Sequence, residues 1–141
     1  MIQFIAPLTT NGFFCDKFQE KLNKIEDLGG YIAGGCARAA SRAFSIEHPA
    51  SRYEDIDFFL DQNAAYDTIF TQFKEWFGYL GTNDYNGVEV DNFKSMDRKI
   101  QLIKQPFLAP EKQLERFDLS VCQAFIYDGH AHVSYQCWDD C

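Results

Sequence analysis

The chain has 141 residues, of which 46% are hydrophobic and 24% charged, a composition typical of a globular protein and unlike that of a disordered chain. Twenty-one acidic residues outnumber thirteen basic ones, and the net charge of −8 excludes a uniformly basic protein that coats nucleic acid. No apolar stretch approaches the roughly 20 residues of a membrane span, and residues 1–10 lack a secretory signal pattern, so we expect one cytoplasmic domain, residues 1–141, with no membrane contact.

The first half of the chain alternates helix and strand patterns. Apolar residues recur at three- and four-residue steps from Phe14 to Leu28, which predicts an amphipathic helix that ends at Gly29–Gly30. A short apolar strand follows over 31–33 and leads through Gly34–Gly35 into a helix over 36–44. The other elements predicted in this half are a strand over 55–60 and a helix over 64–77, whose aromatic side chains share one face.

In the second half the hydrophobic period changes to two. Asn86–Gly87, flanked by alternating residues, is a strong signal for a tight hairpin. The further predicted elements are strands over 99–104, 117–126 and 131–136, and one or two helical turns over 111–115. This order predicts an α/β (α+β) fold with a mixed, largely antiparallel sheet and helices mainly on one face.

Five cysteines stand at irregular spacing along the chain. An odd number without a regular pattern argues against a disulfide framework and favours free thiols in the cytoplasm. Cys137 and Cys141 form a C-x3-C pair without a matching second pair, so we expect no zinc site there.

Two acids in the strand over 55–60 could carry chemistry. Alternate side chains of a strand share a face, so Asp55 and Asp57 point the same way while Ile56 and Phe58 point into the core. Carboxylates placed in this way can hold magnesium ions. A third acid, Asp118, stands between apolar neighbours in the strand predicted over 117–126. The alternative is that these acids are solvated on an open sheet face.

The glycine pair before the second helix favours a ligand site. Gly34 and Gly35 follow an apolar strand and open a helix, where backbone N–H groups attract anions. Arg38 and Arg42 are four residues apart on that helix, with Ser41 close by. The alternatives are a tight turn for the glycines and a solvated helix face for the arginines. Together with the acids, these residues predict a site for a triphosphate and its metal ions.

These motifs resemble those of the nucleotidyltransferase superfamily of the DNA polymerase beta type. The matching segments are Ala33-Gly34-Gly35, Asp55-Ile56-Asp57-Phe58 and Phe117-Asp118-Leu119. The segment from Gly34 to Arg38 is also similar to the G-G-x-V-R-D opening of CCA-adding enzymes and bacterial poly(A) polymerases, with Ala39 in place of the aspartate. The resemblance extends over residues 14–126. More loosely, the chain is similar to phage-encoded members of this superfamily.

The resemblance implies a polymerase-beta-like fold and a two-metal phosphoryl-transfer enzyme. Asp55 and Asp57 would ligate two Mg²⁺ ions, with Mn²⁺ as an alternative ion, and Asp118 would hold the ion that activates the attacking hydroxyl. The residues implied in binding the nucleotide, ATP or another triphosphate, are Gly34, Gly35, Arg38, Ser41 and Arg42.

The reaction expected from the resemblance is transfer of a nucleoside monophosphate from a nucleoside triphosphate to a hydroxyl, with release of pyrophosphate. The acceptor stays open between a tRNA or other RNA end, a protein and a small molecule. Because no helical domain follows the predicted sheet, three alternatives stay open: a minimal nucleotidyltransferase, a catalytic part of a longer protein with a further C-terminal domain, and a chain whose missing surface a partner protein supplies. The alternative function is a non-catalytic, antitoxin-like interaction module that keeps the fold and the nucleotide pocket.

Overall fold

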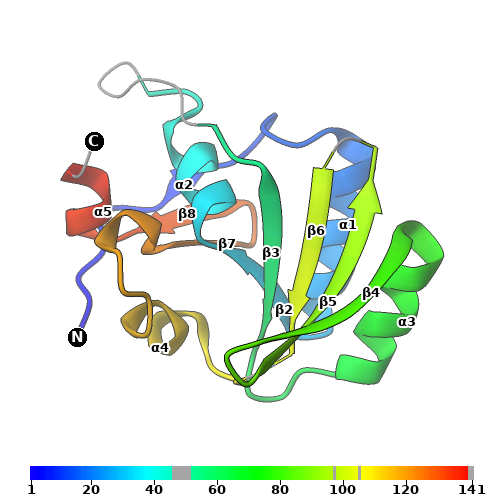
Figure 1. Ribbon diagram of the computed structural model, residues 1–141. Coiled ribbons are helices and arrows are strands. Elements are labelled where there is room, and N and C mark those ends of the chain that lie inside the picture. Colours follow the sequence, from blue (N-terminus) through cyan, green and yellow to red (C-terminus); the bar gives the residue numbers. More distant parts are fainter. Residues whose placement is uncertain (46–51, 97, 105, 140–141) are drawn as a thin grey trace.

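The computed structural model describes residues 1–45, 52–96, 98–104 and 106–139. Their strands form one eight-stranded sheet in the order β1-β8-β7-β2-β3-β6-β5-β4 (Figure 1). All neighbouring strands are antiparallel except β3 and β6, which are parallel. The strands are β1 (Leu8–Thr9), β2 (Gly30–Ala33), β3 (Asp55–Leu60), β4 (Gly78–Tyr85), β5 (Val88–Ser95), β6 (Arg98–Ile103), β7 (Ala124–Tyr127) and β8 (His130–Val133).

Helices cover mainly one face of this sheet, as the sequence predicts. Figure 1 shows α2 against β7 and β8 and α4 apart from the other helices, while α1 packs on β2 and α3 on β4. None of the helices in the described ranges is long and apolar enough to cross a membrane. The helices are α1 (Asp16–Asp27), α2 (Gly35–Arg42), α3 (Tyr66–Trp76), α4 (Pro110–Glu115) and α5 (Tyr135–Asp139), with a 3-10 turn, η1, at Ser120–Cys122.

Two apolar clusters fill the two faces of the sheet. The larger one lies under α1, α2 and α3, where the ring of Phe73 contacts Phe58 and Phe93 at centroid distances of 5.0 and 5.3 Å. The smaller one packs Leu114 of α4 against Tyr31 and the strand residues next to it. Both faces are therefore covered near β2 and β3, whereas α4 covers only part of the second face.

The hairpin between β4 and β5 has the geometry that its sequence predicts. Asn86 and Gly87 have φ angles of 54° and 85°, which a type I′ turn requires at both central positions. The carboxylate of Asp84 accepts the N–H of Gly87 at 2.7 Å and closes the turn.

The prediction of one strand over 117–126 is wrong. The sheet receives only β7 from this region, and η1 precedes it. The ring of Phe117 packs on that of Phe59 at 5.6 Å, while Leu119 is 64% exposed. In a strand, Phe117 and Leu119 would point to the same face. In the structure one of them is packed and the other exposed, so the segment is not a strand of the sheet.

The strand predicted over 131–136 is shorter than expected, because helix α5 begins at Tyr135. The hydroxyl of Ser134 accepts the N–H of Cys137 at 2.9 Å, which is the bond of a serine that caps a helix N-terminus. Ser134 is therefore the residue in the sequence that indicates the start of this helix.

Candidate functional site

Strand β3 presents its two acids to the partly covered face of the sheet. Ile56 and Phe58 are buried in the larger core cluster, so Asp55 and Asp57 point to the opposite face, as the alternation predicts. In the parallel pairing of β3 with β6, Asp55 lies opposite Lys99 and Asp57 opposite Gln101. A cation therefore stands beside the acids on the next strand.

The glycine pair forms an open turn between β2 and α2. Gly34 has a φ of +90°, a conformation that L side chains rarely adopt, and its N–H donates to the carbonyl of Ala124 at 2.9 Å. A Cβ atom added at Gly34 or Gly35 would meet no atom within 4 Å. The glycines thus leave free space in front of the first turn of α2.

Asp118 reaches the same region from the loop that follows α4. Leu114 and Phe117 pack into the smaller core cluster, and the Phe117 ring contacts Phe59, two residues after Asp57 on β3. Because Phe117 is anchored in this way, Asp118 lies near Asp57 and Phe59 of β3, although it belongs to a loop and not to a strand.

A cavity of about 450 Å³ unites these segments. It brings together four residues that the sequence singles out, Gly34, Gly35, Asp57 and Asp118. Arg116 also lines it and was missed, although it stands only two residues before Asp118. We call this the acidic cavity; its lining is Ala33, Gly34, Gly35, Asp57, Phe59, Arg116, Phe117, Asp118, Leu119 and Cys122.

Asp57 is the electrostatically unusual group of the acidic cavity. Its Oδ1 atom is buried and has no hydrogen-bond partner. Burial, together with repulsion from Asp55, raises the pKa of Asp57 to about 6, although the positive charge of Lys99 acts in the opposite direction. The Oδ1 atom therefore lacks the donor that a buried polar atom requires.

The other predicted site residues lie outside the lining of the acidic cavity. The hydroxyl of Ser41 donates to the carbonyl of Arg38 at 2.6 Å, within helix α2. Arg42 is 2% exposed and donates to the carbonyl of Cys137 at 2.6 Å, so it joins α2 to α5. Arg38 is half-buried, and Asp55 lies on β3 beyond the lining residues.

The three acids do not build the two-ion metal centre that the resemblance implies. Within the ranges that the structure describes, no group of three or more His, Cys, Asp or Glu side chains could hold a metal ion. Asp57 and Asp118 share the acidic cavity, but Asp55 does not line it. Two divalent ions would need more oxygen ligands than this pair supplies.

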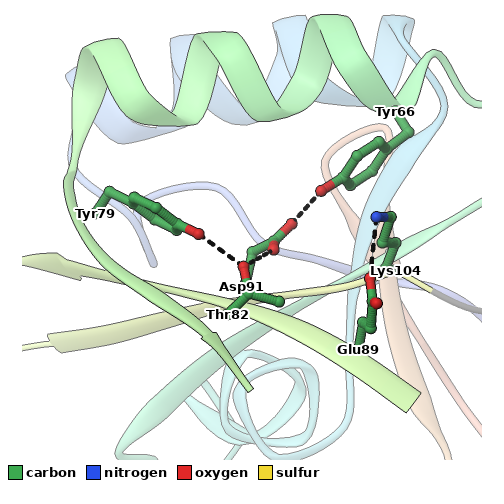
Figure 2. Close-up of polar contacts among 6 residues, drawn as sticks. All are labelled: Tyr66, Tyr79, Thr82, Glu89, Asp91 and Lys104. Carbon is green, nitrogen blue, oxygen red and sulfur yellow. Dashed lines mark hydrogen bonds and ion pairs between the residues drawn. The ribbon is translucent and has the colours of Figure 1, made fainter. Parts of the chain in front are cut away.

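A second buried carboxylate, Asp91, belongs to a closed polar cluster (Figure 2). Tyr66 donates its hydroxyl hydrogen to Asp91 Oδ2, and Thr82 donates to Oδ1 at 2.6 Å. The hydroxyl of Tyr79 lies 2.7 Å from that of Thr82. Burial, and then the hydrogen bond to Asp91, raise the pKa of Tyr66. Because both oxygens of Asp91 are satisfied, this cluster fixes α3 and β4 against β5 and offers no free ligand group.

Comparison with known proteins gives one family. The model of a family described as "Gad2: Gabija anti-defense 2 family protein" matches residues 9–139, nearly the whole chain. No curated protein matches the chain, and no solved structure matches it.

This match corrects the assignment made from the motifs. The matching family is an anti-defense family and not a recognised nucleotidyltransferase family, so the predicted superfamily and the predicted nucleotidyl transfer with ATP and magnesium are wrong. The glycine turn and the acids are present as predicted, but a strand, a glycine turn and a helix occur in proteins of many functions. The non-catalytic alternative agrees better with the family.

Proposed function

The chain belongs to the Gabija anti-defense 2 family, and we propose that it counteracts Gabija defense by binding a protein partner without chemical turnover. The contact site in this proposal is the acidic cavity, which receives a basic side chain, Lys or Arg, of the partner. The observation that carries the proposal is that two acids, the half-buried Asp57 and the exposed Asp118, line the same cavity.

A basic side chain would pair with the part of the Asp57 carboxyl group that faces the cavity. A charge-assisted hydrogen bond of this kind is stronger than one between neutral groups, and it strengthens as the partner excludes water from the cavity. Asp118 adds a second negative charge to the same cavity, and the positive charge of Arg116, which also lines it, acts in the opposite direction.

The glycines and the overall charge support a basic protein partner. The open space at Gly34 and Gly35 leaves room for the stem of a long side chain beside Asp57. The net charge of −8 favours encounter with a positively charged surface. We propose the cytoplasm as the compartment, because the cysteines described, Cys15, Cys36, Cys122 and Cys137, are free thiols.

The first prediction concerns protection of an infecting phage. In bacteria that carry Gabija, the protein with Asp57→Ala or Asp118→Ala is expected to lose its anti-defense effect, measured as phage plating efficiency. Removing the half-buried Asp57, which the partner would enclose further, is expected to cost about 2–5 kcal/mol, a loss of affinity of about thirtyfold or more. The exposed Asp118 is expected to contribute less. Asp27→Ala, an exposed acid at the end of α1, is the matched control and should keep full protection. Full protection by both cavity variants at equal protein levels would contradict the proposal.

The second prediction separates binding from turnover. The purified protein, incubated with Mg²⁺ and each of the four ribonucleoside triphosphates, is expected to release no more pyrophosphate than the Asp57→Ala variant. The reason is that the described residues form no group that could hold a metal ion. Magnesium-dependent release that Asp57→Ala abolishes, and that EDTA stops, would show catalysis and sink the non-catalytic proposal.

A further inference from the structure

A second cavity lies on the opposite face of the same strands. Its volume is about 330 Å³, within the range of ligand pockets. Ile56 of β3 and Ile100 of β6 line it, and they are paired neighbours whose side chains point away from the acidic cavity. We call it the basic-rimmed pocket; its lining is Phe13, Phe14, Cys15, Lys17, Phe18, Lys21, Tyr53, Ile56, Phe77, Ser95, Met96, Arg98 and Ile100.

Aromatic rings form the wall of this pocket that comes from the start of α1. The ring centroid of Phe14 lies 4.9 Å from that of Phe13 and 4.8 Å from that of Phe18. These rings are only half-buried, so each keeps a part of its apolar surface toward solvent. Met96, which is 91% exposed, also lines the pocket. Half-covered rings beside an exposed methionine suit an apolar side chain from another molecule.

The rim of the pocket is positively charged. Lys17, Lys21 and Arg98 line it, and no acidic residue in the described ranges does. Arg98 is held in place: its guanidinium stacks 4.0 Å from the centroid of the Tyr53 ring and donates to the carbonyl of Tyr53. Neither lysine forms an ion pair within the described parts of the chain. In a chain with a net charge of −8, this is a local site of opposite charge.

We propose that the basic-rimmed pocket binds an acidic amphipathic segment of a protein. An apolar side chain of that segment enters between the Phe14 and Ile56 walls, and its carboxylates meet Lys17 and Lys21. Charge complementarity selects this occupant, since three cations around an apolar floor repel a basic segment and attract an acidic one. The inference extends the proposed binding function, because it gives the protein two contact surfaces of opposite charge.

Synthetic peptides test this occupant with the full chain. The probe is a short fluorescent peptide in which Leu and Phe alternate with Glu, and its two counterparts carry Lys for each Glu or Ser for each apolar residue. Fluorescence anisotropy should show binding of the acidic amphipathic peptide alone. Equal binding of the Lys peptide, equal binding of the Ser peptide, or no binding of the acidic peptide would overturn the proposal.

Charge-reversal variants locate the binding on the protein. Lys17→Glu combined with Lys21→Glu should lower the affinity for the acidic peptide at least about tenfold, which corresponds to roughly 1.4 kcal/mol. Lys74→Glu combined with Lys112→Glu changes the net charge equally, away from the pocket, and should leave affinity unchanged. Equal weakening by both pairs would mean non-specific attraction and overturn the proposal. So would a single-stranded DNA probe that binds in place of the peptide and is lost in the pocket variant.

The two binding surfaces can fail independently. Asp57→Ala should keep full affinity for the acidic probe, because Asp57 faces the other side of β3. If Asp57→Ala and Asp118→Ala both keep protection while the variant with Lys17→Glu and Lys21→Glu no longer binds the probe, the acidic-cavity proposal fails and the pocket proposal stands. If the pocket variant keeps the probe, the pocket proposal fails whatever Asp57 does.

Discussion

Replacing Gly29 with alanine is expected to lower the free energy of unfolding by about 2–5 kcal/mol, the sum of a backbone term and a packing term. Gly29 has a φ of +97°, where an L side chain is strained. Its Cβ would also lie 2.7 Å from Cα and 3.0 Å from Cβ of Ala64, in the turn between β3 and α3. That turn cannot move away easily, because Asp61 N–H donates to the Gly29 carbonyl at 2.7 Å.

Gly87→Ala is the matched control for this prediction. Gly87 also has a positive φ, +85°, but a Cβ there meets no atom within 4 Å. It should therefore lose only the backbone term, about 1–2 kcal/mol. Urea denaturation of both variants measures the difference, which isolates the contact with Ala64. An equal loss of unfolding free energy in the two variants would show that the contact with Ala64 does not destabilise Gly29→Ala.

Removing the charge of Glu26 is expected to stabilise the protein at alkaline pH. Burial raises the pKa of Glu26 to about 7, and Asp128 and Asp27 add repulsion, although the N–H of Asp128 donates to Oε1 at 3.2 Å. Oε2 is buried without a partner. Since the unfolded chain releases this proton near 4.5, the folded state loses stability as pH rises between about 4.5 and 7.

Glu26→Gln should therefore raise the free energy of unfolding by about 1–3 kcal/mol at pH 8. The upper end of this range follows from the shift in the pKa of Glu26, at about 1.36 kcal/mol per pKa unit. At pH 4 the difference should vanish, because Glu26 is then protonated in both states. The raised pKa of Asp57 acts in the same direction, but it is common to both proteins and cancels in the comparison. Glu20→Gln, on the exposed side of α1, is the control. A gain that is equal at pH 4 and pH 8 would contradict the titration of Glu26 as its cause.

Much of the fold follows from local patterns in the sequence. The alternation over Asp55–Leu60, the Asn86–Gly87 turn and the apolar spacing from Phe14 to Leu28 each specify an element through its own residues. Such elements are predictable because the hydrophobic period and the turn chemistry agree.

The failures arise where tertiary contacts decide. Phe117 and Leu119 have the alternation of a strand. The ring of Phe117, however, packs on Phe59 of β3, so the segment lies against a face of the sheet and does not pair with a strand. Arg42 has the spacing of an anion-binding residue, yet its guanidinium binds the carbonyl of Cys137, ninety-five positions along the chain. No local pattern in the sequence predicts a contact between residues so far apart in the chain.

Half of the predicted site residues lie together in the structure. Gly34, Gly35, Asp57 and Asp118 line one cavity, whereas Arg38, Ser41, Arg42 and Asp55 do not, and the role of each stays a prediction. Their residue types and spacing describe the geometry of a strand, a turn and a helix, and this geometry does not specify a reaction. The family match, which spans residues 9–139, gives the family that the motifs did not.

The alternation of β3 has a consequence for how this protein can change over time. Asp57 lines one cavity and Ile56, its neighbour in the chain, lines the other. Substitutions at odd-numbered positions of the strand therefore alter the side of the sheet with the acidic cavity, and substitutions at even-numbered positions alter the side with the basic-rimmed pocket. In the arrangement proposed above, an anti-defense protein can adapt one contact surface to a changed partner while it conserves the second. A single inserted residue within the strand would exchange the two faces and abolish both at once.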